Sequence, residues 1–337
     1  MNDAPNPAAG QRARVLLTNP IHPAWHERLA EQCDVVVAPD AKPPTIAALI
    51  TDADGLIVRS LLAPDVFAHA PRLRAVVRHG VGLDLIPVAD ATARGIPVAN
   101  LPGSNTRAVA EFCLAAMLHL RRNLAGLDHR LRNGGWAAAR PLADTGIELG
   151  GSVIGIVGVG AIGTRIAKAA AALDMRVLGL TRRPQTLAAL AAQTGVAIEP
   201  TDKATLFAKS DVVVLSCPLN EQTRGLVDAA TVAAMKPGAI LINVSRGPVV
   251  DTGAVLAALR ENRLGGAALD VHDQQPLTGG EPLFDTPNLL LTPHVAGITA
   301  TSLQGMSQSS VETLLALLRG ERPANVVNPE VFGRAGT

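Results

Sequence analysis

The chain is predicted to be an α/β protein built on two doubly wound parallel sheets, and three observations lead to this fold class. Short apolar runs alternate with helical stretches along both halves of the chain, which is the pattern of parallel strands joined by crossover helices. The length of 337 residues is typical of about two domains. Near the middle, a buried-strand pattern at 152–157 runs directly into a glycine-rich turn and a helix.

About the first hundred residues form an α/β unit of their own. Its predicted strands are residues 14–17, 35–38, 55–58, 75–78 and 97–99, and its predicted helices are residues 25–32, 45–51, 64–69 and 84–94. A turn rich in Pro, Gly, Ser and Asn follows. A long helix is then predicted from about 106 to 123, with Ser104 or Asn105 as its N-cap.

The second α/β unit begins after residue 150. Its predicted strands are residues 153–157, 175–180, 212–216, 239–244, 267–271 and 288–291, and its predicted helices are residues 162–173, 185–193, 228–234 and 253–261. A final amphipathic helix is predicted at 300–319. Residues 133–150 are rich in Gly and contain Trp136, so they are predicted to be an arm or a connection rather than a core element.

The glycine-rich turn of the second unit is a G-x-G-x-x-G pattern, made by Gly158, Gly160 and Gly163. The three glycines permit a tight turn, a close approach of a pyrophosphate to the backbone, and close packing of helix on strand. The phosphates then lie against the N–H groups of Ala161 and Ile162, at the positive end of the helix. The pattern predicts a dinucleotide site in a Rossmann-like unit.

The choice of cofactor is indicated by the end of the next strand. An NAD site usually has an acidic residue there, about 20 residues after the G-x-G-x-x-G pattern, and this residue binds the ribose 2′-hydroxyl. This chain has Thr181, Arg182 and Arg183 instead. No carboxylate would repel a 2′-phosphate and two guanidinium groups could bind it, so NADP(H) is favoured and NAD(H) stays an alternative.

Composition excludes several classes of partner. The formal net charge is +1, which argues against binding of nucleic acid or membrane surfaces by bulk electrostatics. No uncharged apolar segment reaches the roughly 18 residues of a membrane span. Residues 1–11 lack an apolar signal core and are predicted to be a frayed tail, and the three cysteines are scattered, so a cytoplasmic location is expected. No metal site is predicted.

Five segments, in this order along the chain, resemble signatures of the D-2-hydroxyacid dehydrogenases: PGSN at 102–105, CPLNEQT at 217–223, NVSRGPVVD at 243–251, LDV at 269–271 and LTPHVAG at 291–297. The resemblance runs from about residue 15 to 328. It implies a dinucleotide-binding domain, residues 105–294, inserted into a discontinuous substrate domain, residues 1–104 plus 295–337, with the active site in a cleft between them. It also implies a homodimer in which the arm at 133–150, with Trp136, lies near the partner subunit.

Reduction of a 2-oxo acid needs a cation that binds the carboxylate and polarises the carbonyl, and an acid that protonates the developing alkoxide. By resemblance, Arg246 takes the first role, for which a bidentate guanidinium is suited. His294 takes the second, because imidazole titrates near neutrality.

The chain departs from the family where a catalytic carboxylate is usual, five residues after Asp270. Gln275 stands there, and it can orient the His294 ring but cannot stabilise an imidazolium ionically. Formate dehydrogenases of the same superfamily pair Gln with His, and their reaction needs no protonation of the substrate. Asp273 is either a replacement for the missing carboxylate, if the loop is reshaped, or an exposed loop acid.

Substrate contacts are also implied by the resemblance. The N–H groups of Val81 and Gly82 match the family loop that binds the substrate carboxylate. Arg59 and Ser60, at the end of a predicted strand, match another substrate position. Arg78 and His79, which precede the loop of Val81 and Gly82, add positive potential there. A substrate with a second acidic group is therefore compatible with the sequence.

Further cofactor contacts are implied by the resemblance at Thr106, Cys217, Pro218, Thr223, Val244, Ser245, Asp270 and Gly297. Together these features predict an oxidoreductase that transfers a hydride between NADP(H) and a small 2-oxo or 2-hydroxy acid of the D series, similar to glyoxylate or hydroxypyruvate. Two alternatives stay open. One is formate-like hydride abstraction with Gln275 and His294, and the other is a nucleotide-sensing regulatory protein with little activity.

Overall fold

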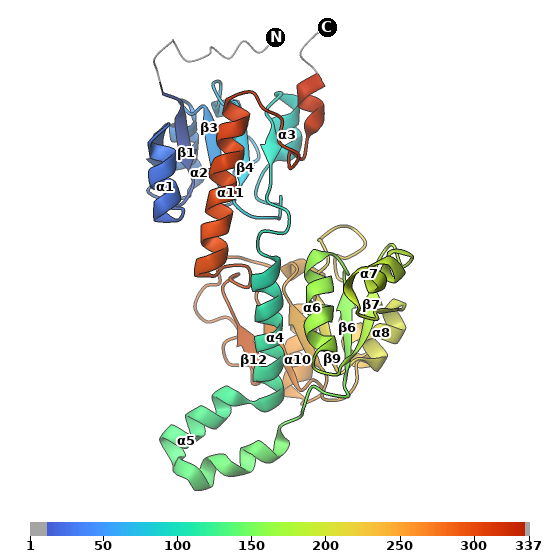
Figure 1. Cartoon of the computed structure of the whole chain (residues 1–337). Helices are drawn as coiled ribbons and strands as arrows, with labels where there is room; N and C mark the ends of the chain where they lie inside the picture. Colours follow the sequence, from blue (N-terminus) through green and yellow to red (C-terminus); the bar gives the residue numbers. More distant parts are fainter. Residues whose placement is uncertain (1–11, 334–337) are drawn as a thin grey trace. The chain divides into compact units, whose positions relative to one another are not determined.

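The computed structural model describes residues 12–333, and the predicted tail at 1–11 lies outside them. The chain divides into two compact units. Unit 1 comprises Met1–Asn105 and Thr299–Thr337, and unit 2 comprises Thr106–Ile298. Each contains one parallel sheet, so the predicted fold class, two doubly wound α/β units, is confirmed (Figure 1).

Unit 1 is built on a five-stranded sheet in the order β2-β1-β3-β4-β5. Its strands are β1 (Arg14–Leu17), β2 (Asp34–Val37), β3 (Gly55–Val58), β4 (Ala75–Arg78) and β5 (Val98–Ala99). Its helices are α1 (Pro23–Ala30), α2 (Pro43–Ile50), α3 (Val88–Ala93) and α11 (Ala300–Leu318), with short 3₁₀ helices η1 (Val66–His69) and η4 (Pro329–Gly333).

Alternate residues of the central strands pack on opposite faces of this sheet. Leu56 and Val58 face a core that includes α2 and η1, whereas Ile57 and Val77 face a core that includes α1 and α11. Both faces are covered, which explains why these strands are continuous apolar runs in the sequence.

Two predicted helices of unit 1 are shorter than expected. The helix predicted at 84–94 is only α3, and the one predicted at 64–69 is only the 3₁₀ helix η1. Pro87 explains the first difference, because the residue before a proline is disfavoured in the helical conformation and Ile86 is therefore excluded from the helix.

Unit 2 is built on a seven-stranded sheet in the order β12-β11-β10-β9-β6-β7-β8. Its strands are β6 (Val153–Val157), β7 (Arg176–Leu180), β8 (Glu199–Pro200), β9 (Val212–Leu215), β10 (Ile240–Asn243), β11 (Gly266–Leu269) and β12 (Leu289–Leu291). Its helices are α4 (Thr106–Arg122), α5 (Leu124–Ala139), α6 (Ala161–Ala171), α7 (Thr186–Thr194), α8 (Lys203–Lys209), α9 (Ala229–Ala234) and α10 (Thr252–Arg260), with η2 (Arg140–Thr145) and η3 (Gly247–Val249).

The strand β8 and the helix α8 of unit 2 were not predicted. The strand β8 has only two residues, both exposed, so it leaves no hydrophobic pattern. The helix α8 begins after Asp202, whose carboxylate accepts a hydrogen bond from the N–H of Thr205 at 2.8 Å. That N-cap signature is visible in the sequence and could have revealed the helix.

The segment predicted as an arm or connection is largely helical. The helix α5 continues to Ala139, with Gly135 in a non-helical conformation at φ +72°, and η2 follows. Figure 1 shows α5 extending away from the sheet of unit 2. Trp136 is 73% exposed, and Leu124 and Leu131 on the same helix are also exposed.

The predicted N-caps of α4 are wrong. The Ser104 hydroxyl donates to the carbonyl of Leu101 at 2.8 Å, which closes the preceding turn. The side-chain oxygen of Asn105 is buried and has no hydrogen-bond partner among residues 12–333. Neither side chain therefore makes a capping hydrogen bond to the first turn of α4.

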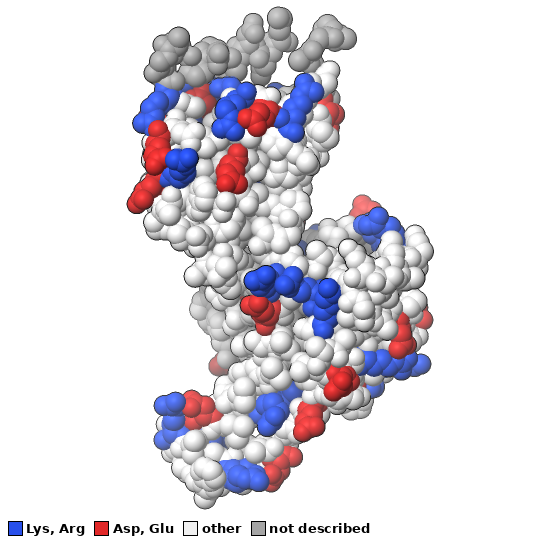
Figure 2. Space-filling model, in the orientation of Figure 1, with Lys and Arg blue, Asp and Glu red and all other residues white. Residues whose placement is uncertain are grey.

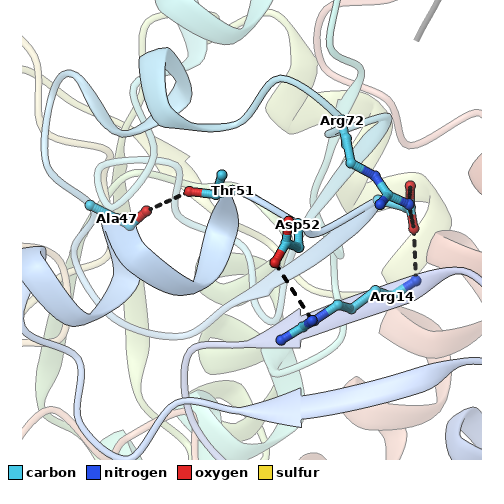
Figure 3. A network of polar contacts seen from close by, with 6 residues as sticks. Arg14, Ala47, Thr51, Asp52 and Arg72 are labelled. Carbon is cyan, nitrogen blue, oxygen red and sulfur yellow. Dashed lines mark hydrogen bonds and ion pairs between the residues drawn. The ribbon is translucent and has the colours of Figure 1, made fainter. Parts of the chain in front are cut away.

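The amino ends of both sheets are held by a buried or half-buried aspartate. In unit 1, Asp54 accepts a hydrogen bond from the N–H of Arg14 at 2.8 Å and from the Arg72 guanidinium at 3.1 Å. Figure 3 shows Arg14 and Arg72 at this edge and the ion pair between Arg14 and Asp52 as a dashed line. The Arg14 guanidinium lies 3.7 Å from the Asp52 carboxylate. In unit 2, Asp211 accepts from the N–H of Val153 at 2.8 Å. These contacts stabilise the edge opposite the predicted functional residues.

Candidate active site

The predicted functional residues lie at the carboxyl ends of the strands in both units. In unit 2 they follow β6, β7, β9, β10, β11 and β12, and in unit 1 they follow β3 and β4. Open parallel sheets bind ligands at this edge, outside the point where the strand order reverses. In unit 2 that point lies between β6 and β9.

The glycine turn after β6 fits a dinucleotide by three separate observations. Gly158 has φ +90°, and a Cβ there would lie 2.7 Å from the backbone of Cys217. A Cβ on Gly163 would overlap the carbonyl oxygen of Gly158. A Cβ on Gly160 would meet no heavy atom within 4 Å. Gly158 and Gly163 are thus needed by the fold, whereas Gly160 leaves open space where a phosphate would lie.

The helix α6 starts beside that open space. Gly160 is its N-cap and has no side chain to accept hydrogen bonds from the first turn. The N–H groups of Ala161 and Ile162 therefore stay available to an outside acceptor, at the positive end of the helix dipole. This arrangement can hold a pyrophosphate.

The segment after β7 carries the two predicted guanidinium groups. Arg182 and Arg183 are exposed, and neither side chain has a hydrogen bond or ion pair with any residue in 12–333. The Thr181 hydroxyl accepts a weak hydrogen bond from the N–H of Arg183 at 3.4 Å. The cations are therefore accessible to an anionic ligand.

His294 and Gln275 contact each other directly. The Gln275 Oε1 lies 3.0 Å from His294 Nδ1, and the Gln275 Nε2 donates to the carbonyl of His272 at 3.2 Å. Because the amide nitrogen is used by that carbonyl, Oε1 accepts and the Nδ1–H of His294 donates. The ring is held in the tautomer in which Nε2 is the atom that gains or loses a proton. Both side chains are exposed, so this proton can reach a ligand.

The loop that carries His294 is held by Asp270. His294 has φ +58°, an unusual conformation for a residue with a side chain, and its N–H donates to the Asp270 carbonyl at 2.8 Å. The Asp270 carboxylate is 2% exposed and accepts from the Thr292 hydroxyl at 2.6 Å, the Val295 N–H at 2.8 Å and the Ala296 N–H at 2.9 Å. Asp270 thus orients the histidine loop, and its predicted cofactor contact stays a prediction.

His272 joins the same structure and was not predicted. Its ring is buried, and its Nε2 lies 3.0 Å from the carbonyl of Thr292. A Cβ on Gly247 would overlap the His272 backbone, so the loop after Arg246 packs closely against it. A histidine beside a loop acid gives no sequence signal for this role.

Arg246 follows β10 and is half-buried, with its guanidinium donating to the carbonyl of Ser245 at 2.6 Å. Asn243, the last residue of β10, is 1% exposed and is hydrogen-bonded to this loop. Its amide donates to the Arg246 carbonyl at 3.0 Å and accepts from the Ser245 N–H at 3.0 Å. A buried amide at the end of an apolar strand is the signal that could have identified Asn243 as a support.

The remaining predicted cofactor residues of unit 2 lie along the same edge. Cys217 is buried, which raises the pKa of its thiol, and its carbonyl accepts from the Ser245 hydroxyl. The Thr223 hydroxyl donates to the Pro218 carbonyl at 2.7 Å and so closes the loop after β9. Thr106, Val244 and Gly297 are partly exposed at the start of α4 and in the loops after β10 and β12. The Cys217 Sγ lies 3.8 Å from the Ser245 hydroxyl, so the side chains of Cys217 and Thr223 both have internal partners.

Asp273 makes no hydrogen bond or ion pair with His294 in residues 12–333. It is placed near Asp251 and Thr252, and partial burial and then the Asp251 charge raise the pKa of its carboxyl. Gln275, not Asp273, therefore contacts His294.

In unit 1, polar side chains gather where β1 and β3 end. The Thr18 hydroxyl accepts from the N–H of Arg59 at 2.8 Å, and the Ser60 hydroxyl donates to the side-chain oxygen of Asn19 at 2.6 Å. The Arg59 guanidinium donates to the carbonyl of Pro20. This is the reversal point of the five-stranded sheet, and its polar groups suit a small polar ligand.

The loop after β4 carries Val81 and Gly82, which are half-buried. Their N–H groups have no hydrogen-bond acceptor among residues 12–333. Behind the loop, His79 is 4% exposed and its Nε2 lies 2.9 Å from the Ser307 hydroxyl of α11. Burial, and then the Arg59 charge, lower the pKa of His79 to about 4.

Residues 12–333 lack two further features. They contain no cluster of three or more His, Cys, Asp or Glu side chains that could hold a metal ion. They also contain no helix with the length and hydropathy needed to cross a bilayer. On the face in Figure 2, Lys and Arg side chains are interspersed with Asp and Glu rather than gathered into one basic surface.

Comparison with known proteins agrees with this geometry. The model of the family described as "D-isomer specific 2-hydroxyacid dehydrogenase, NAD binding domain" matches residues 114–296. The glyoxylate reductase of Aeropyrum pernix is 36% identical over 331 residues, which cover 95% of this chain and 97% of that protein.

Solved structures give the same result. A protein from Thermus thermophilus superposes with a TM-score of 0.83 at 34% identity, covering 93% of this chain and 99% of that one. An NADPH-dependent glyoxylate/hydroxypyruvate reductase from Sinorhizobium meliloti, in complex with NADP and malonate, has a TM-score of 0.83 at 30% identity, covering 97% of this chain and 100% of that one.

Proposed function

Because the chain belongs to the D-isomer specific 2-hydroxyacid dehydrogenase family, we propose that it reduces glyoxylate, hydroxypyruvate or a similar small 2-oxo acid with NADP(H). The contact that carries the proposal is the hydrogen bond between His294 and Gln275 at the edge that also bears Arg246 and the glycine turn. In this reaction a 2-oxo acid, NADPH and a proton give a D-2-hydroxy acid and NADP⁺.

Unit 2 is proposed to bind the cofactor. Gly158 and Gly163 shape the turn, and Ala161 and Ile162 offer their N–H groups to the pyrophosphate. The 2′-phosphate is bound by Arg182, Arg183 and Thr181, whose exposure supports this role. The bound nicotinamide supplies or accepts the hydride.

Two residues are proposed to act on the substrate: Arg246 binds its negative charge, and His294 donates the proton that the alkoxide gains. Arg246 binds the carboxylate and polarises the carbonyl, as its guanidinium is suited to do. His294 gives its Nε2 proton to the developing alkoxide, while Gln275 holds Nδ1–H and so keeps the ring in the required tautomer. Gln275 adds no negative charge, so the imidazolium has less support than beside a carboxylate.

Unit 1 is proposed to bind the rest of the acid. The N–H groups of Val81 and Gly82 bind the carboxylate, and Arg59 and Ser60 contact the remainder. The positive potential near Arg59 makes a second acidic group acceptable. The malonate held by the Sinorhizobium meliloti relative is a small dicarboxylic acid and is consistent with this class.

We also propose that the chain forms a homodimer through the arm, in which the exposed Trp136 and Leu131 of α5 lie near the partner subunit. A contiguous group of exposed apolar side chains marks an interaction site, and the exposed Trp136 and Leu131 would belong to such a group. Light scattering on the purified protein tests this state directly.

The experiment that tests the activity is a panel of 2-oxo acids assayed with NADPH and with NADH. We expect glyoxylate or hydroxypyruvate with NADPH to give the highest kcat/KM. Arg182→Ala should remove most of the preference for NADPH, expected at about thirtyfold from roughly 2 kcal/mol of charge-assisted contacts, and should leave NADH use nearly unchanged. Equal kcat/KM for both cofactors in the parent protein would contradict the assignment of NADP(H).

A second candidate is formate oxidation, which the Gln275–His294 contact favours because that reaction leaves CO₂ and needs no protonation of the substrate. The same panel therefore includes formate with NADP⁺ and NAD⁺. A protein that binds the cofactor but converts none of these substrates would instead support a nucleotide-sensing regulator.

A further inference from the structure

The loop between β4 and α3 is held by the residue that precedes it. The Arg78 guanidinium donates to three carbonyl groups: to His79 at 2.6 Å, to Val58 at 3.0 Å and, through Nε, to Gly82 at 3.1 Å. The first and last residues of the loop are thus joined through one side chain. A planar guanidinium with several fixed donors can do this, whereas a lysine ammonium, a compact point charge, cannot reproduce its geometry.

The two middle carbonyls are held from the other side. The Val81 carbonyl accepts from the side-chain amide of Asn100 at 2.7 Å, and the Gly80 carbonyl accepts from the N–H of Leu101 at 2.9 Å. Asn100 is itself held, because its carbonyl accepts from the side-chain amide of Asn325 at 2.7 Å. All four carbonyls of residues 79–82 are therefore engaged within unit 1.

The loop wraps tightly around the Arg78 side chain. Gly80 has φ +145°, a conformation that side chains rarely adopt, and a Cβ there would lie 3.3 Å from the guanidinium. With every carbonyl engaged inward, the N–H groups of Val81 and Gly82 are the polar groups of the loop without an acceptor in residues 12–333. Consecutive unpaired N–H groups of this kind bind anions.

We infer that Arg78 is a positioning residue, which holds the N–H groups of Val81 and Gly82 in place for the substrate carboxylate, with Asn100 as a second support. The inference deepens the proposed function and rests on it for the identity of the anion. Arg78 acts through the loop, and its permanent charge behind the loop adds to the attraction of a carboxylate.

The test compares Arg78→Lys with a matched control in the full-length protein. Arg78→Lys keeps the charge but loses the geometry, so we expect KM for glyoxylate to rise about tenfold to thirtyfold, with kcat within about threefold of the parent and NADPH affinity unchanged. Asn100→Ala should shift KM in the same direction, by less. Arg72→Lys is the control, because Arg72 pairs with Asp54 at the opposite edge of the same sheet. It should lower Tm without changing KM.

A binding measurement separates this inference from the proposed function. Oxalate, a dicarboxylate that cannot be reduced in this way, is added to the NADPH-saturated protein while the amide resonances of Val81 and Gly82 are followed by NMR. We expect both to shift in the parent protein, and oxalate affinity to fall in Arg78→Lys by the same factor by which KM rises.

The kinetic and binding measurements together distinguish a failure of the proposed function from a failure of the inference about Arg78. If the parent binds oxalate at Val81 and Gly82 but reduces no 2-oxo acid, the proposed function is wrong and the loop assignment is supported. If the parent reduces glyoxylate but Arg78→Lys keeps the parental KM and oxalate affinity, the inference about Arg78 is wrong and the proposed function stands. If oxalate shifts neither amide in the parent, the inference is also wrong.

Discussion

The turn after β1 in unit 1 and the turn after β6 in unit 2 occupy the same place in their sheets. Each follows the first strand of its unit, beside the point where the strand order reverses. In unit 2 the turn is made of glycines, and a Cβ on Gly160 would meet only open space. In unit 1 the turn is Thr18, Asn19 and Pro20, and its side chains bond to the loop after β3.

The difference is what the two proposed ligands, a dinucleotide in unit 2 and a small acid in unit 1, would require of one topology. A pyrophosphate needs bare backbone N–H groups at the start of a helix, which the glycines expose. The side chains of Thr18 and Asn19 instead fill that position with hydroxyl and amide groups, which suit a smaller ligand. Side chains at one turn, rather than the order of strands, therefore determine what each unit can bind.

The largest expected effect tests whether proton transfer belongs to unit 2 alone. His294→Ala should lower kcat by about 10³-fold, within the usual range for loss of a general acid, and should change KM little. Ser60→Ala, at the edge of unit 1, should raise KM a few-fold and leave kcat nearly unchanged. Steady-state kinetics with glyoxylate measure both. A near-parental kcat in His294→Ala would mean that another group is the acid.

The next effect tests the open space at Gly160. The methyl group of Gly160→Ala meets no protein atom, so Tm should stay at the parental value, but it occupies the place of a phosphate. NADPH affinity should fall by about a hundredfold, near the upper end of the roughly 1–3 kcal/mol that overpacking costs. Fluorescence titration with NADPH measures this.

Gly158→Ala is the matched control. Its Cβ would lie 2.7 Å from the Cys217 backbone at φ +90°, so it should lower Tm as well as affinity. Unchanged NADPH affinity in Gly160→Ala would show that the phosphates do not lie at this turn.

A third effect concerns stability and belongs to unit 1. Burial lowers the pKa of His79 to about 4 in the folded protein, from the ordinary histidine value of 6.5. Between these values the unfolded chain binds more protons, so the free energy of unfolding falls as pH decreases through this window. The loss attributable to His79 between pH 7 and pH 5 is about 2 kcal/mol.

His79→Gln removes the titration while its amide can still reach the Ser307 hydroxyl. Urea unfolding at the two pH values should therefore show a smaller pH dependence in this variant by about that amount. An equal pH dependence in parent and variant would contradict the assignment.

The smallest effect sharpens the role of Gln275. A glutamate in its place would favour the imidazolium form of His294, so the proton donor would survive to higher pH. Gln275→Glu should move the falling limb of the reductive kcat/KM profile upward by about one pH unit. A deuterated cofactor serves as the control: a full isotope effect with a superimposable profile would show that the carboxylate does not act on His294.

Local sequence determined the elements and the chemistry of the individual motifs. Apolar runs indicated the buried strands of both sheets because parallel strands are covered on both faces. The glycines at 158, 160 and 163 indicated their turn because Gly158 and Gly163 have local steric requirements and Gly160 leaves space for a phosphate. Errors occurred at the exposed two-residue β8, where the local signal is weak, and at the helix that Pro87 shortens.

Only the tertiary structure decided how the functional side chains are held. The choice between Gln275 and Asp273 as partner of His294 depends on the course of one loop, and the sequence alone leaves Asp273 open as a replacement for the missing carboxylate. The clamp of Asp270 on the histidine loop spans 25 residues to Val295. The physical reason is that hydrophobic periodicity depends only on residues close in the sequence, and so the sequence shows it directly. Hydrogen bonds between loops join atoms that only the folded sheet brings together.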